Sequence, residues 1–166
     1  YDVEGVDGDG DTVTGSIDAT LYPAGATVNG DELGNILDGT DGIDYILGND
    51  GSDTLTGLGG NDILVGGDDS DTFVFSMASN TDDDVIVDFE IGTDSLSFTD
   101  VIDTGTAGLD LNDVVSSVSD GGAGSDVTVN LTNGGSVILS GIGTGSTTDA
   151  SALESLIGAA NIDLTS

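Results

Sequence analysis

Residues 30–74 repeat with a period of nine, as GDELGNILD, GTDGIDYIL, GNDGSDTLT, GLGGNDILV and GGDDSDTFV. These segments are called units 1 to 5. Every unit begins with Gly, its sixth residue is Asn in unit 1 and Asp in the others, and its eighth residue is Leu, Ile or Phe. Five units in one frame, without an insertion, indicate a repeat architecture in which each unit packs against its neighbours.

The period of nine predicts a coil. Six residues of each unit suit a turn and three suit a strand, so two units complete one coil, and the turns of units i and i+2 stack on the same side. Stacked coils lie ~4.8 Å apart, as strands do in any sheet. The eighth residue then points into the coil and residues seven and nine point outward. The sixth residues come into line as the pairs Asn35 with Asp53, Asp44 with Asp62, and Asp53 with Asp71.

The stacked carboxylates present an electrostatic problem. Two unit charges at that spacing repel by roughly 3 kcal/mol at an effective dielectric constant near 20. Burying one Leu or Ile side chain stabilises the fold by about 1.5–3 kcal/mol, which the repulsion cancels. The chain has no Lys, Arg or His to neutralise the carboxylates. Calcium, a hard cation, suits cages of carboxylate and carbonyl oxygens. We therefore predict that residues 30–74 are largely unfolded without calcium and fold with it.

The repeat, G-G-x-G-x-D-x-U-x, resembles the repeats-in-toxin (RTX) family of calcium-bound parallel β-rolls. Two features depart from the family pattern: the second Gly is met only by Gly67, and units 1 and 5 lack the Gly at position 4. Each Asp also has the simpler interpretation of a solvated turn residue. The resemblance implies about three calcium ions, between units 1 and 3, 2 and 4, and 3 and 5.

The resemblance also implies the ligands. The side chains would come from position 6, with Asp53 bridging two ions and the Asn35 site the weakest because it carries less charge: Asn35, Asp44, Asp53, Asp62 and Asp71. The turn carbonyls would come, site by site, from Asp31, Leu33, Gly48 and Asp50; from Thr40, Gly42, Gly57 and Gly59; and from Asn49, Gly51, Gly66 and Asp68.

The composition excludes several classes of partner. The net charge is −32 with no cationic side chain, so phosphate backbones and anionic membranes are repelled and we expect no nucleic-acid binding. No apolar run is long enough to span a bilayer, so we expect no membrane insertion. A disordered acidic tail would explain the acidity, as would a salt-adapted proteome, but neither explains the repeat.

The chain divides into three predicted regions. Residues 1–29 are interpreted as the end of an upstream β domain and a junction, with strands at 2–6 and 12–22. Residues 30–75 form the calcium-binding roll, and residues 76–166 a C-terminal region. The predicted fold class is all-β: a short calcium-bound parallel β-roll followed by an antiparallel β region with one or two short helices.

The C-terminal region carries several local signals. They predict strands at 85–89 and 95–98, a hairpin of 127–132 with 136–140, and a short helix at 110–115. Residues 161–166 are either a strand or a frayed end. A capping box at Ser151–Glu154 predicts a second helix, which Gly158 would end.

One outward face of the predicted roll is apolar. Positions 7 and 9 of units 2 and 4 are Tyr45, Leu47, Ile63 and Val65. Because such a patch is unfavourable in water, we expect the segment after residue 75, or a partner, to cover it.

The segment after the repeats has a second resemblance. Asp84, Ile86, Asp88, Phe89, Gly92 and Asp94 meet the pattern D-x-I-x-D-F-x-x-G-x-D. It is similar to the segment that follows the roll in proteins exported by the type I secretion system. The resemblance implies that the partners are a type I exporter and the rest of a larger polypeptide, and that the protein is secreted or on the cell surface. Asp84, Asp88 and Asp94 are either further calcium ligands or strand-end turn residues, and the second interpretation is favoured.

These signals predict a calcium-binding C-terminal secretion module of an extracellular bacterial adhesin, which folds on calcium after type I export. The alternative is a stand-alone ligand-binding or ice-binding calcium β-solenoid.

We expect no enzymatic activity. Asp103-Thr-Gly resembles half of an aspartic-protease site, but that chemistry needs two such carboxylates, and the chain has no His, Lys or Cys for other acid–base or nucleophilic chemistry. Asp7, Asp9 and Asp11 have the spacing of an EF-hand loop, yet Thr12 replaces its essential Gly.

Overall fold

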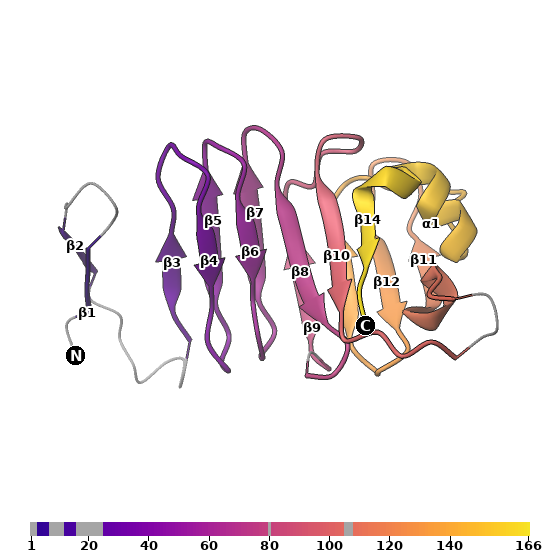
Figure 1. Cartoon of the computed structure of the whole chain (residues 1–166). Helices are drawn as coiled ribbons and strands as arrows, with labels where there is room; N and C mark the ends of the chain where they lie inside the picture. The colour runs from indigo at the N-terminus through magenta and orange to yellow at the C-terminus, as the bar shows by residue number, and fades with distance from the viewer. Residues whose placement is uncertain (1–2, 7–11, 16–24, 80, 105–107) are drawn as a thin grey trace.

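The computed structural model describes residues 3–6, 12–15, 25–79, 81–104 and 108–166. Two sheets built mostly of parallel strands form a roll, whose strands are stacked along its axis in near-sequence order (Figure 1). The predicted all-β class and the parallel roll are confirmed. Helix α1 lies at the far end of the roll from β3 (Figure 1).

The first sheet contains five strands, and every neighbouring pair is parallel. Its order is β14 (Ile162–Leu164), β10 (Ser95–Thr99), β8 (Thr72–Ser76), β6 (Thr54–Thr56) and β4 (Ile36–Asp38).

The second sheet contains seven strands, parallel from β3 to β13 and antiparallel at the β13–β12–β11 end. Its order is β11 (Val115–Asp120), β12 (Val127–Leu131), β13 (Ser136–Leu139), β9 (Asp83–Ile86), β7 (Ile63–Gly67), β5 (Tyr45–Asn49) and β3 (Thr27–Asn29).

The eighth residues of the repeat form the core, as predicted. Leu37 pairs with Leu55 and Leu55 with Phe73 in one sheet, and Ile46 pairs with Leu64 in the other. All five are at least 92% buried, because the register of two units per coil places each above its equivalent on the inner face.

The roll is longer than the repeats. On one side, β3 pairs in parallel with β5, so the coil begins before residue 30. On the other, β9, β10, β13 and β14 add parallel strands after residue 75. The expectation that everything after the repeats is antiparallel is wrong for these four strands. Each satisfies the backbone N–H and C=O groups that would be left unpaired at the edge of the preceding strand.

Local predictions beyond the repeats are largely confirmed. β12 and β13 form the expected hairpin, with Gly134 at φ 107° in the turn. The short helix is a 3₁₀ turn, η1 (Leu111–Asp113), followed later by η2 (Ala159–Asn161). Helix α1 (Ala150–Ile157) packs against β11 and η1 and ends at Gly158 as predicted.

The start of α1 corrects one detail. Its N-cap is Asp149, whose side chain accepts a hydrogen bond from the Ala152 N–H at 2.8 Å, not the expected Ser151. A carboxylate is as good a cap as a hydroxyl, so the sequence offered two starting points two residues apart.

The N-terminal residues form a separate two-stranded antiparallel sheet, β1 (Val3–Val6) and β2 (Thr12–Gly15). The predicted strand at 2–6 agrees with β1. Of the predicted strand at 12–22, residues 12–15 form β2, and the remainder lies outside the described residues, as do Asp7, Asp9 and Asp11.

Of the two covers expected for the apolar face of the roll, the described residues after 75 do not supply one, and cover by a partner stays a prediction. Tyr45 and Ile63 on this face remain 42% and 39% exposed. The later residues continue the sheets instead of lying over them, because strand pairing satisfies their own backbone groups as well as the open sheet edges.

Candidate metal centre

The sixth residues of the repeats form a ladder through the roll. The N–H of Asn35 donates to Asp53 Oδ1 at 2.7 Å, that of Asp44 to Asp62 Oδ1 at 2.8 Å, and that of Asp53 to Asp71 Oδ1 at 2.9 Å. The structure therefore brings together the three pairs that the period predicted. The four carboxylates are 98–99% buried, and Asn35 is half-buried.

The ladder continues past the repeats. The Asp62 N–H donates to Asp84 Oδ1 at 2.9 Å, and the Asp71 N–H donates to Asp94 Oδ1 at 3.0 Å. Asp84 and Asp94 are each 1% exposed. The term carboxylate ladder is used below for Asn35, Asp44, Asp53, Asp62, Asp71, Asp84 and Asp94.

One oxygen of each central carboxylate has no partner. Within the described part of the chain, Oδ2 of Asp53, Asp62 and Asp71 is buried and makes no hydrogen bond. An isolated anionic oxygen buried in this way is strongly unfavourable unless it is paired or coordinates a metal. These atoms are therefore the first structural sign of a cation.

Oxygen atoms converge at the first residue of each unit. A Cβ on Gly48 would collide with Asp53 Oδ2 and with the Gly66 carbonyl oxygen, and one on Gly39 would lie 2.5 Å from both Asp44 Oδ2 and the Gly57 carbonyl oxygen. Gly is thus required where a side-chain oxygen of one coil approaches a carbonyl oxygen of the next. A donor set of carboxylate and carbonyl oxygens is the kind that calcium prefers.

Carbonyl groups are needed to complete any such cage. In the described residues, no group of three or more acidic side chains has the arrangement of a metal site by itself. The predicted carbonyls of Thr40 and Asn49 already accept the N–H groups of Gly59 and Asp68, at 3.1 and 2.9 Å. A carbonyl oxygen has two lone pairs, so these remain able to bind an ion.

The other predicted carbonyls lie in the same turns. Those of Gly48, Gly57 and Gly66 face the side chain at position 6 of the preceding coil. Those of Leu33 and Gly42 lie against Gly51 and Gly60, whose missing side chains let the turns approach. Asp31 and Asp50 lie at the outer rim.

The comparisons with known proteins agree with this geometry. Residues 38–73 match the family described as the RTX calcium-binding nonapeptide repeat, in four copies. Residues 38–73 are thus similar to RTX repeats. Among solved structures, the chain is similar to the AlgE6R3 subunit of the Azotobacter vinelandii mannuronan C5-epimerase, with 23% identity and a TM-score of 0.55 over 84% of this chain and 78% of that one. This likeness shows the β-roll fold. No curated protein sequence matches the chain.

The turns of the RTX repeats explain the glycines of the motif. Position 2 has positive φ in units 3, 4 and 5, at Asn49 (78°), Leu58 (71°) and Gly67 (104°), and position 4 does at Gly51 (102°) and Gly60 (108°). Glycine adopts this left-handed conformation without a steric penalty, whereas Leu58 does not.

Replacing Leu58 with Gly should therefore stabilise the calcium-loaded roll. The Leu58 side chain is 44% exposed, so little packing is lost, and relief of the left-handed backbone is worth about 1 kcal/mol. Thermal unfolding in saturating calcium measures the effect. An unchanged or lower melting temperature would contradict the assignment of strain to this residue.

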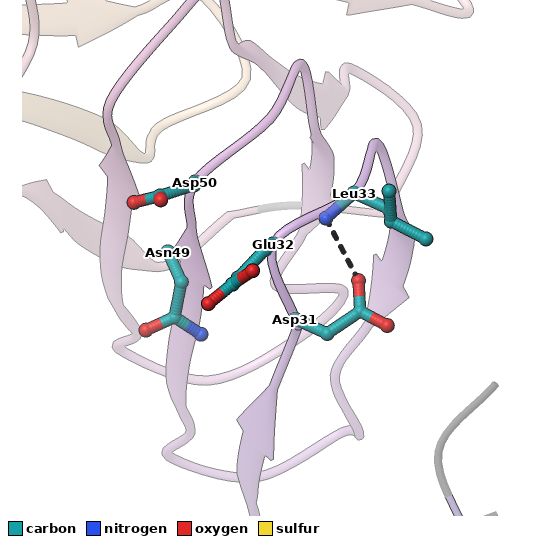
Figure 2. A pocket seen from close by; sticks show the side chains of 5 residues that line it. All are labelled: Asp31, Glu32, Leu33, Asn49 and Asp50. Atoms are coloured by element: carbon teal, nitrogen blue, oxygen red, sulfur yellow. Dashed lines mark hydrogen bonds between the residues drawn. The ribbon is translucent and has the colours of Figure 1, made fainter. Parts of the chain in front are cut away.

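An open pocket of ≈ 720 Å³ lies at the outer rim of the first turns. Asp31, Glu32 and Asp50 bring three carboxylates to it, beside Leu33 and Asn49 (Figure 2). Asp31 accepts the Leu33 N–H at 2.9 Å. Sequence analysis did not identify Glu32, although its position in the repeat is acidic in four of the five units, because position 3 is a predicted ligand only in the second turn of each pair and unit 1 is never the second. The pocket is solvent-facing, unlike the buried oxygens of the ladder.

Burial perturbs the ladder carboxylates. Desolvation is the largest cause in each case and raises the pKa of Asp62 to about 7 and that of Asp71 to about 6. It also raises the pKa of Asp53 and Asp94. Hydrogen bonds from the ladder N–H groups oppose the shift, and neighbouring carboxylates add to it.

Without calcium, the roll should become more stable as the pH falls. A carboxyl whose folded pKa is raised binds more protons folded than unfolded, so stability declines as the pH rises from about 4 to about 7. We expect more β-structure at pH 5 than at pH 8 in the presence of chelator, measured by circular dichroism. With calcium the trend should reverse, because the ion needs ionised ligands.

The double variant Asp62→Asn with Asp71→Asn is the control for this effect. It should weaken the pH dependence of the calcium-free roll, since the two groups with the largest shifts are gone, and Asp53 and Asp94 should retain the remainder. A wild-type profile that is level from pH 5 to 8 in chelator would contradict the prediction.

Proposed function

We propose that this chain is a calcium-folded C-terminal secretion module of an extracellular bacterial adhesin, exported by a type I system. The observation that carries the calcium role is the row of buried oxygens on Asp53, Asp62 and Asp71 that find no hydrogen-bond partner in the part of the chain that the structure describes. The sequence has no Lys, Arg or His to neutralise them.

The residues present fit calcium. Asn35, Asp44, Asp53, Asp62 and Asp71 would supply side-chain oxygens, and the turns would supply carbonyls, for about three ions between the coils. Bound calcium would contribute positive charge among stacked carboxylates and so link each coil to the next. The role is structural and not catalytic, and the free energy of binding becomes free energy of folding.

This coupling suits export followed by folding. At low internal calcium the repulsion along the ladder favours the unfolded chain, which an exporter can pass. At higher external calcium the roll folds and return is hindered. The resemblance of Asp84–Asp94 to segments of type I substrates supports this route. In the structure the same segment supplies two ladder residues, so its folding depends on the roll.

The β1–β2 pair forms its own sheet apart from the two sheets of the roll. In the described residues, no helix is long and apolar enough to cross a membrane.

The experiment compares two fusions in bacteria that carry a working type I exporter. The first places a passenger protein before the full chain, and the second places it after Ser166, which blocks the C-terminal end. We expect the first fusion in the medium and the second in the cells. Deleting residues 76–166 is a poorer test, because that region supplies β9, β10, β13 and β14. Retention of both fusions, while the exporter's own substrate is secreted, would refute the proposal.

A further inference from the structure

The outer face of the seven-stranded sheet carries an apolar stripe that stays open in the described part of the chain. We propose that this stripe binds an amphipathic helix of a partner protein, with Lys or Arg residues along both edges of the helix's apolar face. The proposal needs the folded roll but not the export route, so it goes beyond the function proposed above.

The register of the sheet assembles the stripe. It consists of outward side chains from the neighbouring strands β5, β7, β9 and β13: Tyr45, Leu47, Ile63, Val65, Val85 and Ile138. One row begins at Tyr45 and ends at Ile138, since each of its residues pairs with the next across the sheet. Leu47 and Val65 pair in a second row. Residues two apart on a strand lie on the same face, so the two rows form one surface.

The stripe lacks the cover that a parallel sheet normally has. Most parallel sheets are buried on both faces, usually under helices. Here the inner face is closed, because Ile46, Leu64 and Ile86 are fully buried, whereas Tyr45 and Ile63 of the stripe are exposed. Helix α1 packs instead against β11 and η1, at the end of the sheet (Figure 1). The place of a covering helix over β5, β7 and β9 is consequently open in the described chain.

The opposite outer face of the roll is different in character. On the five-stranded sheet, Thr54 pairs with Thr72, and Asp38 pairs with Thr56. Hydroxyl and charged side chains of this kind are mostly exposed in folded proteins. The apolar side chains are therefore gathered on one face of the roll, as they are at a site that binds another protein.

Acidic residues border the stripe at both ends of its strands. Asp41 and Asp83 lie before it along the chain, Asp50 and Asp68 lie after it, and all four are exposed. Since the chain has no cationic side chain, a second copy would bring like charges together. A partner with Lys or Arg on either side of an apolar surface would match the stripe in both polarity and charge.

The dimensions of the stripe fit a short helix. Neighbouring strands lie ~4.8 Å apart, so the row from Tyr45 to Ile138 is about 14 Å long. A helix of about ten residues covers that length. Its side chains at i, i+4 and i+7 recur about every 5–6 Å, which is close to the strand spacing, so they can lie between successive strands. The acidic turns would then face the two edges of the helix.

The test adds a designed peptide to the full wild-type chain in saturating calcium and measures binding by isothermal titration calorimetry. The peptide is an amphipathic helix of about five turns, with Leu on one face and Lys along both edges of that face. We expect saturable binding of one peptide per chain. A peptide of the same composition, reordered so that its apolar face is lost, should bind more weakly by about tenfold or more. A version with Glu in place of Lys should not bind.

The variant Ile63→Thr locates the site on the stripe. It removes apolar surface from the centre of the stripe and should weaken binding of the designed peptide about tenfold. Ile36→Thr is the matched control, because it makes the same change at position 7 of a repeat on the other sheet, where Ile36 is 79% exposed. Its Kd should equal that of the wild type. Equal affinities of the wild type and Ile63→Thr would overturn the proposal.

Amide chemical shifts of the wild type give a readout that does not depend on a variant folding. Addition of the peptide should move the resonances of β5, β7 and β9 and leave those of β4 and β6 in place. Shifts confined to the acidic turns, or equal binding of the reordered peptide, would indicate attraction of opposite charges alone and overturn the proposal. A calcium-dependent dimer that Ile63→Thr dissociates would also overturn it, because the stripe would then bind a second copy of this chain.

Discussion

The variant Asp53→Asn should raise the calcium concentration needed to fold the roll by roughly 100-fold. Asp53 lies between two coils, with Oδ1 on the Asn35 N–H and the unpartnered Oδ2 beside the Gly66 carbonyl, and so would serve two ions. Asparagine has the same shape but no charge. Removing one partner from a buried charge pair costs about 3 kcal/mol, which corresponds to about two decades in affinity.

A calcium titration followed by circular dichroism measures this shift. Asp38→Asn is the matched control, because it makes the same chemical change at an exposed position on the neighbouring strand β4. Its midpoint should equal that of the wild type. Equal midpoints for Asp53→Asn and Asp38→Asn would show that Asp53 has no special role.

The variant Gly48→Ala should remove the site between units 3 and 5 without changing any charge. The added methyl group would collide with Asp53 Oδ2 and with the Gly66 carbonyl oxygen, the two atoms that would share an ion. Overpacking alone costs about 1–3 kcal/mol, and loss of the ion adds to it. We expect one calcium fewer by native mass spectrometry and a large loss of thermal stability in calcium.

Gly59→Ala provides the comparison, because it keeps the Gly59 carbonyl that is a predicted ligand and adds a methyl group that would not collide with any oxygen of an ion site. A Cβ there would come no closer than 3.6 Å to atoms outside its neighbours, which is ordinary van der Waals contact. This variant should bind the wild-type number of ions and lose little stability. If Gly48→Ala and Gly59→Ala bind the same number of ions and have the same thermal stability, the oxygen atoms beside Gly48 do not form a cation site.

The period of nine was sufficient to predict the interior of the roll. Because the repeat fixes two units per coil, it determined both the burial of Leu55 and Leu64 and the ladder pairs, such as Asp44 with Asp62. Local turn chemistry likewise predicted the β12–β13 hairpin and the end of α1 at Gly158. These features depend on residues close in sequence or on an unbroken period.

The extension of the roll could not be predicted in the same way. The ladder partners Asp84 and Asp94 follow connections with four and five additional residues, which hide their equivalence to position 6. Strand β14 was expected, but its parallel pairing with β10 joins Ile162 to Leu96. No local sequence signal specifies a pairing between residues so far apart in the chain. The pairing depends on which edge of the sheet is still open when β14 is reached.

Chelation of calcium from the full wild-type chain tests the central claim most directly, with hydrogen exchange measured residue by residue. In calcium the backbone amides of residues 30–74 should be strongly protected. After chelation at pH 8 they should exchange as in an unfolded chain, and protection should return when calcium is restored. If those amides stay protected once calcium has been fully removed, the ladder does not need a cation and the account is wrong.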